Sequence, residues 1–142
     1  MAGIFSIPFF IHILILESST SKKGLRNAPE GFGVLSGNDD DTVWMMPKGG
    51  TGVISVASNV APEKMVKFIR ALQGGYTEKA YKLNEELTPL FTNCFVESNP
   101  IPAKAALHAM GLIENEFRLP LVPAQQSTYD LMVKTIKDLG LL

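Results

Sequence analysis

The sequence predicts an α/β domain, in which buried parallel strands alternate with helices, followed by a purely helical segment. Three observations support this prediction. A short β-branched run at residues 52–56 leads directly into a helix that begins near Pro62. A second apolar run lies at residues 33–36, and neither run alternates with charged residues, as expected for strands covered on both faces. The second half of the chain instead places apolar residues at three- and four-residue spacing.

The first strand is expected at residues 11–16, inside an apolar stretch that covers residues 4–16. This stretch is shorter than the ~20 residues that a membrane span needs. It also lacks the basic segment and the small-residue cleavage site of a signal peptide. We therefore expect a cytoplasmic protein without membrane contact, and a small membrane-anchored protein is the disfavoured alternative. His12 has no neighbouring Cys or His, so a packed histidine is favoured over a metal ligand. A polar segment at residues 18–30 ends this region.

Three aspartates at residues 39–41 follow the second strand. Adjacent side chains diverge, and the spacing of a calcium-binding loop is absent, so a divalent metal site is disfavoured. The sequence favours a solvated turn that precedes a short helix from Thr42, capped by Asp40 or Asp41. A glycine-rich turn then leads into the strand at residues 52–56.

Four helices are expected after this strand, because apolar residues recur at helical spacing and Gly or Pro separates the segments. Their expected ranges are 63–73, 76–95, 102–111 and 127–139.

The composition fits one domain of 142 residues with 13 basic and 14 acidic side chains and a net charge of −1. No basic stripe indicates a nucleic-acid partner. The single cysteine, Cys94, excludes an internal disulfide and fits a reducing compartment. Its apolar neighbours favour a buried structural thiol over a nucleophile.

Reactive groups of a parallel α/β fold lie at the carboxyl ends of its strands. Here those ends are residues 36–39 and 55–59. Gly37 lets the backbone approach a small anion, and Ile54 forms an apolar wall beside its own carbonyl. The catalytic motifs of serine hydrolases, zinc proteases and nucleotide-binding loops are not found. From the residues alone, the chain is an α/β piece without an identifiable catalytic centre.

The segments at residues 37–39, 52–56 and 95–104 together resemble the carboxy-terminal part of the dihydrodipicolinate synthase family, and the match runs from residue 28 to residue 142. That family contains Schiff-base lyases of lysine biosynthesis, which condense pyruvate with aspartate semialdehyde. The resemblance implies a partial (β/α)8 TIM barrel, limited to its last two to three strands, over residues 1–73. A carboxy-terminal helical domain would follow over residues 74–142. It also implies a homo-oligomer.

The resemblance implies a substrate-binding role for three residues. Ile54 takes the place of the isoleucine whose backbone contacts pyruvate. Gly37 and Asn38 match the Gly-Asp pair that borders the pocket, with Asn in place of Asp. We expect no metal site and no cofactor.

The catalytic groups of the family have no counterpart in this chain, so no catalytic residue is assigned. The threonine pair, the tyrosine relay and the carboxylate-binding arginine belong to the first half of the barrel. The Schiff-base lysine belongs to a strand that matches residues 14–18, where Leu16 takes its place. Leu cannot form an imine.

Two functional hypotheses follow. In the first, the chain is a truncated member of the lyase family and is inactive alone. In the second, it is a non-catalytic oligomerisation or interaction module whose partial barrel pairs with another chain through open strand edges.

Overall fold

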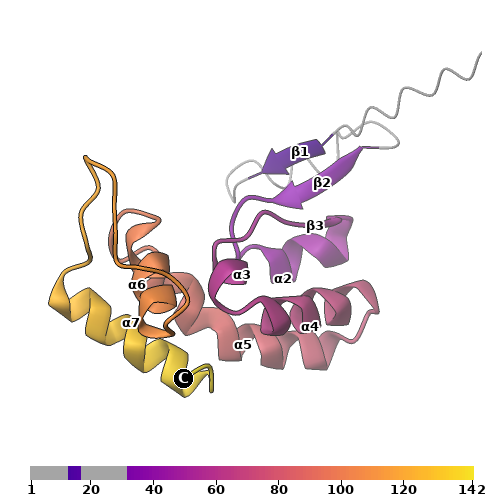
Figure 1. Ribbon diagram of the computed structural model, residues 1–142. Helices are drawn as coiled ribbons and strands as arrows, with labels where there is room; N and C mark the ends of the chain where they lie inside the picture. Colours follow the sequence, from indigo (N-terminus) through magenta and orange to yellow (C-terminus); the bar gives the residue numbers. More distant parts are fainter. Residues whose placement is uncertain (1–12, 17–31) are drawn as a thin grey trace, which may run out of the picture.

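The computed structural model describes residues 13–16 and 32–142 of the chain. Three short strands form one parallel sheet in the order β1-β2-β3, namely β1 (Ile13–Leu16), β2 (Gly33–Ser36) and β3 (Gly52–Val53). Leu16 pairs with Ser36, and Ser36 pairs with Val53. The carboxyl ends of all three strands therefore meet at one edge of the sheet. Figure 1 shows this sheet beside a layer of helices.

The strand predicted at residues 33–36 is confirmed, and the first predicted strand is confirmed for residues 13–16. Residues 11 and 12, and with them His12, lie outside the described residues, as do the apolar stretch before them and the polar segment at residues 18–30.

The buried strand predicted at residues 52–56 is wrong in length and in burial. It ends at Val53, and the Ile54 side chain is 53% exposed. The chain turns into the helical region at Val56 (φ −81°, ψ −44°), immediately before α3 (Ala57–Val60). After this turn the Val56 N–H group donates to the side chain of Asp39.

The four predicted longer helices are confirmed, with ends within two residues of their expected positions, as α4 (Pro62–Gln73), α5 (Thr77–Asn93), α6 (Ile101–Ala109) and α7 (Gln126–Asp138). The short helix predicted from Thr42 is confirmed as α2 (Thr42–Met45). The short helices η1 (Met46–Lys48) and α3 were not predicted. Proline lies in the first turn of α4 and of α6, where its missing N–H costs no helical hydrogen bond. Within the described residues, no helix is long and apolar enough to cross a membrane.

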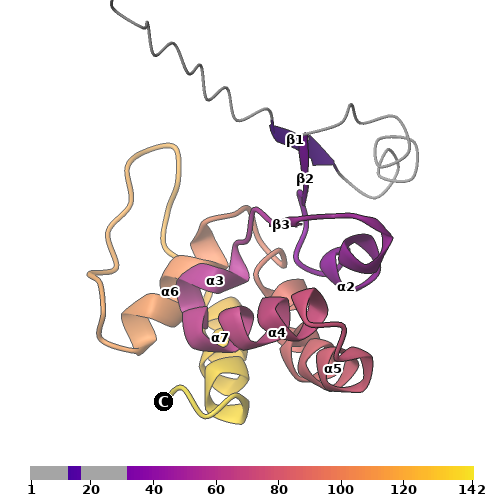
Figure 2. The ribbon, with the colours of Figure 1, turned by 90° about the vertical axis from the view of Figure 1, so that its right-hand side faces the viewer.

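The hydrophobic core lies between the helices. Figure 2 shows α4 and α5 side by side, with α7 packed across α5 and α6. Phe68 on α4 and Phe91 on α5 are almost fully buried, and their ring centroids lie 6.3 Å apart. The same core includes Met132 and Ile136 of α7. It therefore draws residues from both sides of the expected boundary after residue 73, and the division into two domains stays a prediction.

The core position of Phe68 yields a stability prediction. Phe68→Ala removes a fully buried ring and leaves a cavity between α4 and α5, so the free energy of unfolding should fall by about 3–5 kcal/mol. Tyr81→Ala, at a side chain that is 53% exposed, should change it by about 0.5 kcal/mol or less. Urea unfolding followed by circular dichroism measures both, and equal losses would contradict the assignment of the core.

Candidate functional site

The carboxyl edge of the sheet brings the three predicted site residues into neighbouring positions. Gly37 and Asn38 directly follow β2, and Ile54 directly follows β3. The Ile54 N–H donates to the carbonyl oxygen of Ser36, with N and O 2.9 Å apart. The two loops are therefore joined beyond the last paired residues of the sheet.

Asn38 is held in place by both its backbone and its side chain. Its carbonyl oxygen accepts hydrogen bonds from the hydroxyls of Ser36 (2.7 Å) and Thr42 (3.0 Å). Its side-chain amide donates to Asp41 Oδ2 at 3.2 Å. These three hydrogen bonds hold the loop after β2, which begins with Gly37, at the sheet edge.

Ile54 presents an exposed apolar side chain at this edge, and the chain after it is fixed by two serines. The Ser58 N–H donates to Ser55 Oγ at 2.8 Å, and the Ser58 hydroxyl donates to the Ser55 carbonyl at 3.1 Å. No hydrogen bond from a described residue reaches the Ile54 carbonyl oxygen.

Asp39 is the structural centre of the site, and sequence reasoning missed it. Its side chain is 3% exposed, and its Oδ2 accepts hydrogen bonds from the N–H groups of Val56 (3.1 Å) and Ala57 (3.0 Å). A carboxylate at the first N–H groups of a helix is favourable because those groups lack partners within the helix. Asp39 thereby ties the loop after β2 to the start of α3.

The solvated aspartate turn predicted at residues 39–41 is therefore wrong for two of its three members. Asp39 and Asp41 are buried, and only Asp40 is exposed. Asp41 does occupy the position before α2, but its carboxylate does not cap that helix. It accepts instead from the indole N–H of Trp44 at 3.0 Å and from Asn38. Both buried carboxylates therefore accept their hydrogen bonds from protein donors.

The register of the sheet explains why Asp39 reaches α3. Ser36 pairs with Val53, and Asp39 and Val56 each lie three residues further along their chains. The spacing from Ser36 to Asp39 equals the spacing from Val53 to Val56. This equality predicts a contact only when the pairing of Ser36 with Val53 is known.

A hollow of about 300 Å³ lies next to this loop. It is lined by Asn38, Asp39, Asp40, Phe91, Thr92 and Phe95. The loop after β2 therefore borders the end of α5, and the segment at residues 95–104 starts beside the predicted site.

Cys94 is buried completely, which confirms the predicted structural thiol. Burial raises the pKa of this thiol to about 12, and the negative charge of Asp39 contributes in the same direction. The thiol is therefore neutral at physiological pH and is not a nucleophile.

The described residues provide no lysine at the carboxyl edge, since each lysine among them lies on a helix. Lys22 and Lys23 lie outside the described residues. Leu16 ends β1 opposite Ser36, at the same edge as Gly37. Within the described part of the chain, no group of three His, Cys, Asp or Glu side chains is placed to hold a metal ion.

Comparisons with known proteins give one consistent match. A model described as the dihydrodipicolinate synthetase family matches residues 17–139. The 4-hydroxy-tetrahydrodipicolinate synthase of Thermotoga maritima is 50% identical over 117 residues, which cover 82% of this chain and 40% of that protein. The chain thus spans well under half the length of this relative.

Solved structures agree with this match. The dihydrodipicolinate synthase of Aquifex aeolicus is 35% identical, with a TM-score of 0.87 over 92% of this chain and 46% of that one. A monomeric dihydrodipicolinate synthase variant is 44% identical, with a TM-score of 0.86 over 92% of this chain and 45% of its own.

The role of Asp39 yields a prediction with a neighbouring control. Asp39→Ala leaves the N–H groups of Val56 and Ala57 without an acceptor, so it should lower the free energy of unfolding by about 1–3 kcal/mol. Asp40→Ala, at the exposed neighbour, should change it by about 0.5 kcal/mol or less. Urea unfolding compares the two variants, and an Asp39 effect no larger than that of Asp40 would overturn the assignment.

The raised pKa of Cys94 yields a second prediction. At pH 8 the folded chain should react with Ellman's reagent at least about a hundredfold more slowly than the chain in urea, because little thiolate forms in the fold. The folded pKa is above the ordinary value of 9.0, so the corresponding stability is complete below pH 9 and is lost as pH rises toward 12. As pH rises from 9 to 12, the unfolding midpoint of the unchanged chain should therefore fall toward that of Cys94→Ala or below it. Unfolding of both proteins at several pH values in this range measures the effect.

Proposed function

The chain belongs to the dihydrodipicolinate synthetase family, and we propose that it supplies one wall of the pyruvate pocket of a Schiff-base lyase that condenses pyruvate with aspartate semialdehyde. It forms part of a (β/α)8 barrel, limited to its last strands, followed by helices. The observation that carries the proposal is the meeting of Gly37, Asn38 and Ile54 at the carboxyl edge of β2 and β3. Active sites of such barrels lie at this edge.

Each of the three residues has a physical role in this proposal. Gly37 has no side chain, so a small carboxylate reaches the backbone. Asn38 borders the pocket through a loop that Asp41 and Thr42 hold in place. Ile54 offers its carbonyl oxygen and an exposed apolar side chain to the bound substrate.

A polypeptide of these 142 residues is, in this proposal, inactive alone. The covalent step needs an amine that attacks the pyruvate carbonyl and loses water to form an imine. The family's lysine for this step corresponds to Leu16, and no described residue replaces the tyrosine relay that moves the proton. The chain retains a wall of the pocket without the groups that perform the chemistry.

The second candidate function is a non-catalytic oligomerisation or interaction module. It is favoured by the edge of β3, which no described strand covers. Assembly into a homo-oligomer is part of this proposal, and the two candidates differ in whether a pyruvate pocket is completed.

Trapping with borohydride tests inactivity directly. The chain is incubated with pyruvate and sodium borohydride, and its intact mass is measured. We expect no stable pyruvyl adduct, whereas the full Thermotoga maritima synthase under the same conditions provides the positive control. A pyruvyl adduct on this chain would overturn the proposed inactivity.

A gain-of-function variant tests the proposed pocket. Leu16→Lys is mixed with a fragment of the Thermotoga maritima synthase that holds the first five strand–helix units and ends before its Schiff-base lysine. We expect a borohydride-trapped adduct on the variant at residue 16. Because successive residues of a strand alternate between its faces, Ile15→Lys is the matched control and should give no adduct. Equal labelling of both variants would contradict the pocket.

A further inference from the structure

We propose that Asp41 and Trp44 are positioning residues, which orient the side-chain amide of Asn38 so that its oxygen, and not its N–H groups, borders the pyruvate pocket. This role rests on the proposed function, because Asn38 is one of the three residues that we place at that pocket. It goes further by assigning two residues behind the wall of the pocket and by giving its border a defined polarity.

Asp41 contacts both of the other side chains. Its Oδ2 accepts a hydrogen bond from the amide nitrogen of Asn38 at 3.2 Å, and its Oδ1 accepts from the indole N–H of Trp44 at 3.0 Å. Asp41 is buried, at 8% exposed. The Trp44 ring is restrained in turn by Lys48, whose Nζ lies 4.8 Å from the ring centroid. One buried carboxylate therefore links Asn38 to a restrained indole.

The chemistry of these groups sets the direction of both hydrogen bonds. An indole nitrogen only donates and a carboxylate only accepts, whereas a primary amide donates through its nitrogen and accepts through its oxygen. Asn38 can therefore bond to Asp41 only through its nitrogen. The amide oxygen is then the atom that Asn38 presents to a ligand.

The backbone of Asn38 is held independently of Asp41. Its carbonyl oxygen accepts from the hydroxyls of Ser36 (2.7 Å) and Thr42 (3.0 Å), and its N–H donates to Ser36 Oγ at 3.3 Å. A change at Asp41 can therefore turn the amide of Asn38 about its Cβ–Cγ bond while these backbone contacts stay in place.

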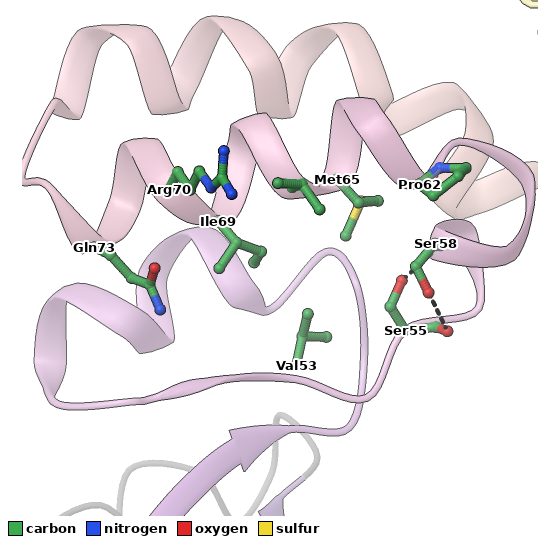
Figure 3. A pocket seen from close by; sticks show the side chains of 9 residues that line it. Val53, Ser55, Ser58, Pro62, Met65, Ile69, Arg70 and Gln73 are labelled. Atoms are coloured by element: carbon green, nitrogen blue, oxygen red, sulfur yellow. Dashed lines mark hydrogen bonds between the residues drawn. The ribbon is translucent and has the colours of Figure 1, made fainter.

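The loop after β3 is held in a different way. Figure 3 shows Ser55 and Ser58 bonded to each other, and each of the two bonds involves a hydroxyl. A hydroxyl both donates and accepts, so these serines do not give the border a fixed polarity. The amide of Asn38, held by Asp41, does so on the side of β2.

The polarity of Asn38 has a consequence for the ligand. An acceptor favours a ligand group that donates, and it disfavours a carboxylate, which carries negative charge. We therefore expect the pyruvate carboxylate to lie against the Gly37 backbone and away from the Asn38 oxygen. Reversal of the amide would place N–H donors at the same position and should strengthen pyruvate binding.

Asp41→Asn should reverse the amide and keep the number of hydrogen bonds. The oxygen of the introduced amide accepts from the Trp44 indole, so its nitrogen faces Asn38. Asn38 must then turn its oxygen inward and its N–H groups toward the pocket. Trp44→Phe removes the donor that orients the introduced amide. In the double variant, with Asp41→Asn and Trp44→Phe, the Asn38 amide can therefore turn back.

Solvent exchange of the Asn38 side-chain N–H groups, measured by NMR on the full chain, tests the orientation directly. In the unchanged chain these groups should exchange about tenfold more slowly than those of the exposed Asn99. Asp41→Asn should accelerate their exchange by about tenfold. Trp44→Phe alone should change it by about twofold or less, because a carboxylate still only accepts. The exchange in the double variant should return toward that of the unchanged chain.

Asp40→Asn is the matched control, because it makes the same substitution at the exposed neighbour of Asp41. It should change the exchange of the Asn38 N–H groups by about twofold or less. Circular dichroism shows whether each variant is folded, and the comparison of Asn38 with Asn99 in the unchanged chain needs no variant.

The effect on the ligand is measured in the Leu16→Lys chain mixed with the Thermotoga maritima fragment described above. With Asp41→Asn, the pyruvate concentration that gives half-maximal trapping should fall by about threefold or more, and the maximal yield of adduct should stay unchanged. Addition of Trp44→Phe should bring this concentration back toward its original value. If Trp44 only stabilised the fold, its loss would add to the effect of Asp41→Asn instead of reversing it.

Three results would overturn the positioning role. They are rapid exchange of the Asn38 N–H groups in the unchanged chain, equal effects of Asp41→Asn and Asp40→Asn, and faster exchange in the double variant than in Asp41→Asn. The proposed function fails separately. If the exchange follows the expected pattern but Leu16→Lys gives no adduct, or the pyruvate dependence does not respond to Asp41→Asn, the orientation of Asn38 is retained and the pocket is contradicted.

Discussion

The carboxylate of Asp39 holds the candidate site together, because it ties the loop after β2 to the start of α3 beyond the short sheet. β2 and β3 share only two residue pairs, and the chain leaves the sheet immediately after them. The two hydrogen bonds from the Val56 and Ala57 N–H groups to Asp39 extend this contact beyond the strands. Gly37, Asn38 and Ile54 all lie between these two fixed points. Their relative positions therefore depend on this buried carboxylate together with the hydrogen bond from the Ile54 N–H to the Ser36 carbonyl.

The same charge connects the sheet edge to the helical part. Asp39 borders a hollow together with Phe91 and Phe95, and it contributes to the raised pKa of Cys94 at the end of α5. Cys94 in turn belongs to the core that α4, α5 and α7 share. A chain of contacts thus runs from the loop after β2 to the carboxy-terminal helices. The helical layer supports the loops at which we propose that pyruvate binds.

The sheet and the helices differ in how completely they bury their apolar surfaces. The helices share a closed core, in which Phe68, Leu87, Leu90, Met132 and Ile136 are fully buried. The sheet ends at β3 with an edge that no described strand covers, which is the arrangement expected of a barrel interrupted between two strands. This contrast explains how one chain combines a well-packed helical part with the incomplete sheet at which we propose the pyruvate pocket. It also places the incomplete surface next to the site, where closure of the barrel would complete both.

The sequence by itself determined the class of the fold and the positions of its four longer helices, because apolar spacing, Gly and Pro are local signals. The ends of α4 to α7 agree with those signals within two residues. It also determined that Cys94 is buried and that the chain resembles one family over most of its length. Tertiary structure decided the length of β3, the exposure of Ile54 and the burial of Asp39 and Asp41. These depend on strand register, which brings Asp39 to the N–H groups of a helix eighteen residues further along the chain. A local pattern predicts a solvated turn at Asp39 because the donors that stabilise its charge are distant in sequence and near only in space.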